Sequence, residues 1–230
     1  MKPTDSHLKY FNKNSANYDL KYSILKHIIT KHIQPNNKIA ELFGGMGITT
    51  NYILKYANPH QIFITEINLD CFEYLQNKFI NENKIELSLQ DANLVLLDKL
   101  NKYQYIFLDN NLTPKNLNIE YSNLYGTLFF LNQTKNFIIT ETGIYNLSFT
   151  KNLTKDKIQK HFEELNLSLN NFNIYIIEVY YTKKFSIIYA SNNPNDKIKL
   201  ITEWTDTNTE WEQFLYQEAK RKLRGLDKWK

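Results

Sequence analysis

The stretch that decides the fold is Glu41-Leu42-Phe43-Gly44-Gly45-Met46-Gly47-Ile48-Thr49-Thr50. The apolar run 38–43 predicts a buried strand, and the residues 48–56 that follow the glycines predict a helix. Glycines at a strand-to-helix turn let the backbone approach a ligand closely, and the first turn of such a helix offers unpaired N–H groups. The stretch therefore predicts a ligand-binding turn.

Strands and helices alternate outward from this turn. Strands are expected at 38–43, 61–66, 85–89, 103–109, 136–141, 174–181 and 184–190, and helices at 20–33, 48–56, 70–81, 92–100, 119–132 and 154–166. This alternation predicts a parallel sheet covered by helices on both faces, while the last two strands predict an antiparallel hairpin. The expected fold is α/β: a Rossmann-like, doubly wound, mostly parallel seven-stranded sheet with a C-terminal hairpin.

Changes in composition predict three segments. Residues 1–35 are expected to form an N-terminal helical extension, 36–190 the α/β domain, and 191–230 a C-terminal tail. The tail holds Trp204, Trp211 and Trp229 and a group of cations. Because the tail follows the hairpin and a linker that contains Pro194, it is expected to lie outside the ligand site.

The composition excludes several classes of protein. The chain has 230 residues, 42% of them hydrophobic, and a formal net charge of +4, which is too mild to indicate a nucleic-acid partner by itself. Its single cysteine, Cys71, excludes an internal disulfide and a cysteine-based metal cage, and no metal site is expected. No apolar run reaches the roughly 18 residues of a membrane helix. An intracellular, reducing compartment is expected, the cytoplasm above all.

Acidic residues stand at the ends of the first four predicted strands: Glu41, Glu66, Asp91 and Asp109. The carboxyl ends of parallel strands meet at one edge, where ligands bind in such sheets. Glu66 is placed to accept the hydroxyls of a ribose, as in dinucleotide enzymes, but Thr50 stands where their third glycine would be. The charge of Glu41 favours a cationic α-amino group over a pyrophosphate.

On these residues the chain resembles the class I S-adenosylmethionine-dependent methyltransferases over about residues 36–190. The resemblance implies that Glu41 lies near the methionine amino group, that Glu66 contacts the ribose, and that Asp91 with Ala92 approaches the adenine. The pattern Glu-x-Phe-x-Gly-x-Gly, in which Phe43 is the Phe, resembles that of the nucleic-acid methyltransferases. The cofactor residues implied are Glu41, Phe43, Gly45, Gly47, Glu66, Asp91 and Ala92.

The fourth motif of that family matches Asp109-Asn110-Asn111, without the Pro-Pro-aromatic of the amino-methylating members. Asp109 and Asn110 are the predicted catalytic residues, since such side chains can hold the N–H or O–H of an acceptor. Tyr121 and Tyr125 are candidates to stack on a base, the alternative being that they fill core or surface. The substrate-binding residues expected are Asn111, Tyr121, Tyr125, Lys220, Arg221, Lys222 and Arg224.

Three functions remain open from the sequence. The first is a methyltransferase that uses S-adenosylmethionine to modify RNA or another nucleic acid. The second is a catalytically inactive subunit with this fold in a larger complex, and the third is a methyltransferase for proteins or small molecules. The basic tail predicts a partner, either RNA phosphates or the acidic face of a protein, and no membrane partner is expected.

Overall fold

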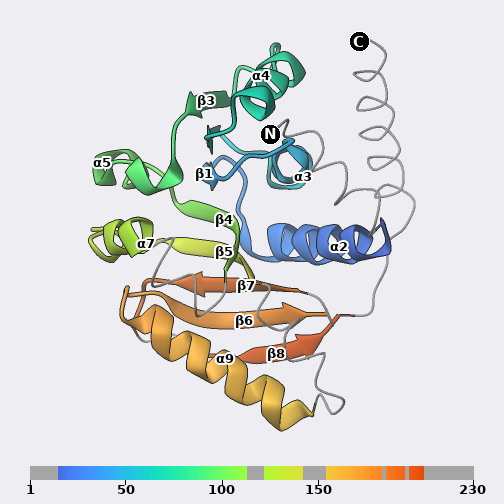
Figure 1. Ribbon diagram of the computed structural model, residues 1–230, viewed down its shortest axis with the longest axis vertical. Helices are drawn as coiled ribbons and strands as arrows, with labels where there is room; N and C mark the ends of the chain where they lie inside the picture. Colours follow the sequence, from blue (N-terminus) through green and yellow to red (C-terminus); the bar gives the residue numbers. More distant parts are fainter. Residues whose placement is uncertain (1–14, 113–121, 142–153, 183–184, 195–196, 205–230) are drawn as a thin grey trace.

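A computed structural model describes residues 15–112, 122–141, 154–182, 185–194 and 197–204 (Figure 1). Its strands are β1 (Lys38–Leu42), β2 (Gln61–Glu66), β3 (Ile85–Leu89), β4 (Tyr105–Leu112), β5 (Asn136–Glu141), β6 (Tyr175–Tyr181), β7 (Ser186–Ser191) and β8 (Leu200–Glu203). Its helices are α2 (Ser15–His32), α3 (Ile48–Ala57), α4 (Leu69–Lys78), the 3₁₀ turn η1 (Ala92–Leu94), α5 (Leu97–Leu100), α7 (Ser122–Phe129) and α9 (Lys155–Asn170).

The strands form one sheet in the order β3-β2-β1-β4-β5-β7-β6-β8. The five strands β1 to β5 are mutually parallel, whereas β7 runs antiparallel to both β5 and β6. The chain builds the sheet from β1 toward β3 and then returns to place β4 on the other side of β1. This reversal is the topological switch point, at which ligands bind in open α/β sheets. The predicted fold class is confirmed.

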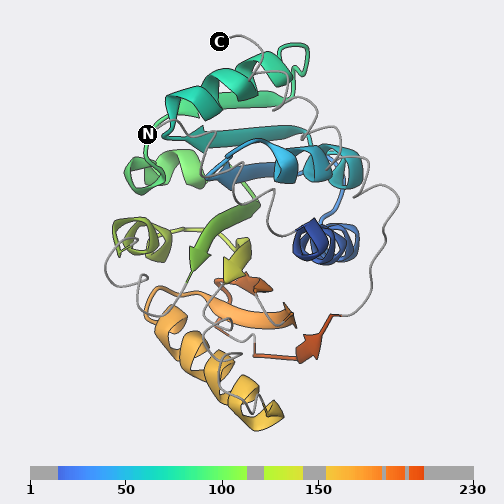
Figure 2. The same ribbon diagram turned by 45° about the vertical axis from the view of Figure 1, so that its right-hand side comes forward.

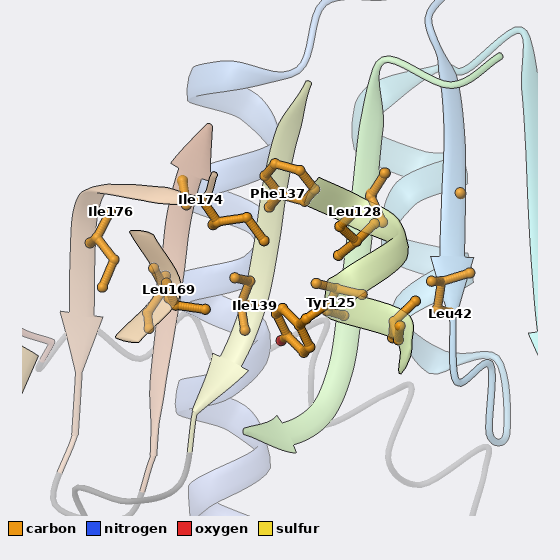
Figure 3. Close-up of a cluster of buried hydrophobic side chains, with 14 of the residues drawn as sticks. Leu42, Tyr125, Leu128, Phe137, Ile139, Leu169, Ile174 and Ile176 are labelled. Carbon is orange, nitrogen blue, oxygen red and sulfur yellow. The ribbon is translucent and has the colours of Figure 1, made fainter. Parts of the chain in front are cut away.

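Helices cover both faces of the sheet. The helices α2, α3 and α4 pack on one face, and α5, α7 and α9 on the other (Figure 2). The second face is closed by an apolar cluster that includes Leu42, Leu128, Ile139 and Leu169 (Figure 3). Tyr125 belongs to this cluster and is 0% exposed. The prediction that Tyr125 stacks on a base is therefore wrong, because its ring is a core element of α7.

The structure has one more strand than the sequence predicted. β8 pairs in parallel with β6 at the edge of the sheet, and it comes from the segment predicted to be tail. Trp204, which follows β8, donates from its backbone N to the Tyr181 carbonyl at 2.8 Å and from Nε1 to Ser23 Oγ at 3.2 Å. The sheet and its contacts with α2 thus continue to residue 204, while the division of the chain into three segments stays a prediction.

Two further elements differ from the expected ones. The segment 92–100, predicted as one helix, is η1 followed by α5, because Val95 and Leu96 between them have extended backbone. β4 continues past Asp109 to Leu112, where a loop was expected. No helix within the described ranges is long and apolar enough to cross a bilayer.

Candidate functional site

The glycine turn follows β1 directly and is packed tightly on one side only. Gly44 N donates to the Thr65 carbonyl at 2.8 Å, and a Cβ on Gly44 would lie 2.4 Å from Ile64 Cγ2. At Gly45, where φ is 51°, an added Cβ would meet no atom of the described residues within 4 Å. Phe43 also has a left-handed backbone, with φ 74°, which is unfavourable for a bulky residue and is found most often at functional sites. The turn therefore rests on β2 and is open at Gly45.

Glu66, at the end of β2, holds this turn in place. Its Oε2 accepts from Gly45 N at 2.7 Å, and its Oε1 accepts from Asn68 N, also at 2.7 Å. Asn68 in turn caps α4 by accepting from Cys71 N. Each carboxylate oxygen keeps a second acceptor position, so Glu66 can fix the turn and still accept from ligand hydroxyls.

Glu41 carries a buried polar atom that no described residue satisfies. Glu41 is 1% exposed, and its Oε2 accepts from Thr50 Oγ1 at 2.7 Å, whereas its Oε1 has no hydrogen-bond partner among the residues that the structure describes. Burial, with a smaller contribution from the nearby charge of Asp109, raises the pKa of this carboxyl to about 8 against the opposing effect of the Thr50 hydrogen bond. An unsatisfied buried oxygen is costly, so the position favours a ligand that brings an N–H donor.

Asp109 is paired with a residue that the sequence analysis missed. Lys21 Nζ, from α2, lies 2.7 Å from both Oδ1 and Oδ2 of Asp109, and Thr49 Oγ1 lies 3.5 Å from Oδ2. Burial would raise the pKa of Asp109, but the Lys21 ammonium outweighs it and lowers the pKa, so the carboxylate is ionised. No sequence signal marks Lys21, because it lies 88 residues from its partner.

The strand that carries Asp109 is irregular at that residue. In the pairing of β4 with β5, Leu108 lies opposite Ile139 and Leu112 lies opposite Glu141, so β4 has extra residues between the two pairs. Such bulges bend a strand and redirect its side chains, often next to active sites. The predicted catalytic Asp109 and Asn110 both lie in this irregular stretch.

The end of β3 lies beside Glu66. Gln90 N donates to the Glu66 carbonyl at 3.1 Å, and Asp91 Oδ1 caps η1 by accepting from Asn93 N at 2.9 Å. Ala92 is 3% exposed. Asn93 Oδ1 is buried with no partner among the described residues, and Asn93 lines a pocket of about 280 Å³ together with 94–97, Thr127 and Phe130.

The structure thus brings Glu41, Gly45, Glu66 and Asp109 to one edge of the sheet and adds Lys21. Side chains of Asn110 and Asn111 lie outside the described residues, as do Tyr121, Lys220, Arg221, Lys222 and Arg224. Within the described ranges, no group of three or more His, Cys, Asp or Glu side chains is placed to hold a metal ion.

Known proteins match this chain in structure and not in sequence. No protein-family model matches it, and no curated protein has a significant sequence match. Among solved structures, a SAM-dependent methyltransferase from Aquifex aeolicus matches with TM-score 0.58 and 17% identity, over 83% of this chain and 98% of the other. M. jannaschii TYW2 in complex with AdoMet matches with TM-score 0.50 and 16% identity, over 72% of each chain.

A fibrillarin/Nop5p complex also matches, with TM-score 0.50 and 18% identity, over 72% of this chain and 78% of the other. Identities this low establish the fold and not the activity. With the switch point between β1 and β4 and the hairpin of β6 and β7 in place, this chain has the fold of the solved S-adenosylmethionine-dependent methyltransferases.

Proposed function

We propose that this chain is a methyltransferase that uses S-adenosylmethionine to modify RNA. The observation that carries the proposal is the unsatisfied Oε1 of buried Glu41, beside a glycine turn that is open at Gly45. Both lie at the switch point of a fold shared with proteins named as SAM-dependent or crystallised with AdoMet. A cofactor that carries an amino group and a ribose fits these groups.

The residues of the edge have distinct parts in holding the cofactor. Glu41 Oε1 would accept from the methionine amino group, and Glu66 would accept from the ribose hydroxyls through its remaining acceptor positions. Asp91 and Ala92 would border the adenine. Gly45 would allow close approach, since no side chain of the described residues fills the space beside it. When bound, S-adenosylmethionine supplies an electrophilic methyl group.

Asp109 would contact the methyl acceptor. Ionised by its pairing with Lys21, it is a hydrogen-bond acceptor that can orient the N–H or O–H of an incoming group. The RNA assignment rests on the pattern Glu41-x-Phe43-x-Gly45-x-Gly47, which is similar to nucleic-acid methyltransferases, and on the cations of the tail.

Two measurements test the proposal. Calorimetric titration with S-adenosylmethionine should give saturable binding, and Glu66→Ala should weaken it at least 10-fold, or about 1.4 kcal/mol. Glu73→Ala, at an exposed position of α4, is the matched control and should bind like the wild type. The second measurement uses S-adenosylmethionine with a tritiated methyl group. The label should pass to unmodified transcripts of tRNA or rRNA and not to casein, which is the protein control. Absence of cofactor binding would refute the proposal, and binding with transfer only to casein would refute its RNA part.

A further inference from the structure

A cation on α4 binds the glycine turn and was not among the predicted site residues. Lys78, the last residue of α4, is partly buried and donates from Nζ to the Met46 carbonyl at 2.9 Å and to the Gly47 carbonyl at 3.0 Å. Both carbonyls belong to the turn that joins β1 to α3, more than 30 residues earlier in the chain. The Lys78 ammonium is therefore in direct contact with the turn on which the proposed cofactor site is built.

The surroundings of Lys78 confine its charge to this place. Nζ lies 5.7 Å from the centre of the Tyr74 ring and 5.1 Å from the centre of the Phe79 ring. Phe79 also closes this side of the turn, because a Cβ on Gly47 would lie 2.7 Å from its Cε2. Aromatic faces and carbonyl oxygens both attract a cation. The charge also reaches the proposed amino-group acceptor: burial raises the pKa of Glu41, and Lys78 is among the charges that lower it.

The backbone of the turn needs support from outside. Phe43, Gly45 and Gly47 all have left-handed backbone, with φ of 74°, 51° and 65°. A left-handed phenylalanine persists only where surrounding contacts hold it, and glycine is free to adopt other conformations. Gly47 is the N-cap of α3 and has no side chain with which to cap the helix. Contacts from neighbouring elements must therefore fix the turn.

Glu66 and Lys78 supply these contacts with opposite charges. Glu66 accepts from Gly45 N, whereas Lys78 donates to the carbonyls of the two residues that follow. The C=O and N–H of a trans peptide point in opposite directions, so the carbonyls that Lys78 draws toward α4 turn the N–H groups of the same peptides away from it. Without the ammonium, either carbonyl would be free to face the cofactor, whose carboxylate it would repel.

We propose that Lys78 is a positioning residue for S-adenosylmethionine, because its ammonium fixes the glycine turn in the form that accepts the cofactor. The inference rests on the proposed function, since the turn is part of the proposed cofactor site. Lys78 acts through the turn, so it affects cofactor binding and not the transfer step. A cation in the last turn of a helix also stabilises that helix. A role limited to stability would lower the melting temperature and leave cofactor affinity unchanged.

A measurement that needs no activity tests the contact. The chain has two methionines, Met1 and Met46, and only Met46 is followed by a glycine. Protein labelled with ¹³C-carbonyl methionine and ¹⁵N-glycine therefore contains one coupled pair, in the peptide after Met46. Lys78→Met should shift this carbonyl resonance upfield, because the carbonyl loses a hydrogen bond. The matched control is Lys84→Met, since Lys84 precedes β3 and donates to Asn58 Oδ1 at 3.0 Å; it should leave the resonance in place. An unchanged resonance in Lys78→Met would overturn the proposal.

Cofactor affinity tests the role of the contact. In calorimetry, Lys78→Met should bind S-adenosylmethionine at least 10-fold more weakly than the wild type, or about 1.4 kcal/mol. Lys78→Arg keeps the charge and the N–H donors and should stay within about threefold of the wild type. In methyl transfer, Lys78→Met should raise KM for the cofactor by a similar factor, with kcat within about twofold of the wild type. Lys84→Met should match the wild type in all three quantities.

Each outcome bears on the proposal. If Lys78→Met fails to fold, Lys78→Gln, which also lacks the charge, provides the same comparison. Unchanged cofactor affinity in the folded variant would overturn this inference alone, as would an equal loss in Lys78→Arg or a fall in kcat with KM unchanged. Failure of the wild type to bind S-adenosylmethionine would overturn the proposed function and this inference with it.

Discussion

Replacing Glu41 by glutamine should make the free energy of unfolding of the protein less sensitive to rising pH. The carboxyl is 1% exposed, and burial raises its pKa to about 8 in the folded protein from 4.5 in the unfolded chain. Between these two values the folded state holds a proton that the unfolded state has lost, so the free energy of unfolding falls as pH rises. The glutamine side chain in Glu41→Gln does not titrate, has nearly the same shape, and can still accept a hydrogen bond from Thr50.

The magnitude follows from the two pKa values. Each unit of pKa difference corresponds to about 1.36 kcal/mol of unfolding free energy. The loss of unfolding free energy caused by Glu41 is near zero below pH 4.5 and reaches its full value above pH 8. Between pH 5 and pH 8 the free energy of unfolding of the wild type should fall by about 3–4 kcal/mol more than that of Glu41→Gln. A single domain is stable by about 5–15 kcal/mol, so the difference is large enough to measure.

Urea unfolding at several pH values between 5 and 8.5, without cofactor, provides the assay. The stabilities of wild type and Glu41→Gln should diverge steadily over this range. Glu73→Gln, on the exposed surface of α4, should run parallel to the wild type. If Glu41→Gln also runs parallel to the wild type, burial does not hold Glu41 protonated, and the raised pKa inferred for this carboxyl is refuted.

Three further outcomes are expected. Lys21→Met should destabilise the protein by about 2 kcal/mol, because it leaves Asp109 unpaired. A double-mutant cycle with Asp109→Asn, measured by urea unfolding, should give a coupling energy of about 1–3 kcal/mol, and additive effects would contradict the pairing. Burial would raise the pKa of Glu178, but hydrogen bonds from Lys31, Tyr180 and His32 outweigh it and lower the pKa to about 2, so this carboxylate contributes stability above pH 4.5 that is lost as pH falls toward 2. Glu178→Gln should remove about 2 kcal/mol at pH 7 and flatten the acid limb of the unfolding curve, and an unchanged limb would assign acid unfolding to other groups. Truncation after Asn193 removes β8 and should lower the melting temperature by about 5–10 °C relative to truncation after Trp204; equal melting temperatures would mean that β8 adds nothing to stability.

The local pattern of the sequence predicted most of the fold. Apolar runs bounded by turn residues identified β1, β2 and β4 to β7, because a strand buried on both faces must be apolar along its length, whereas β3 alternates apolar and polar residues and is only partly buried. β8 was not predicted, because Leu200–Glu203 is short and half polar and is a strand only through its pairing with β6. The break at Val95 and Leu96 was not predicted, because both residues are apolar and fit a helical pattern although their backbone is extended.

The candidate site was predictable only where it is local. The glycine turn and the acids that end β1 and β2 can be found from spacing along the chain. The pairing of Lys21 with Asp109 joins two elements 88 residues apart in sequence, and no periodicity encodes such a contact. Tyr125 was misplaced as a substrate residue because a tyrosine in the core and one on a binding surface look alike in a tyrosine-rich sequence.

The strand order has a consequence for synthesis of this protein on the ribosome. β5 is complete at Glu141, but its neighbour β7 begins at Ser186, 45 residues later. At about 5–20 residues per second, the apolar edge of β5 waits several seconds for its partner. During that interval the nascent chain presents an unpaired edge with Phe137, Ile138 and Ile139, which is a template for aggregation. Premature termination between β5 and β7 should therefore yield chains that depend on chaperones, although all five parallel strands have already been made.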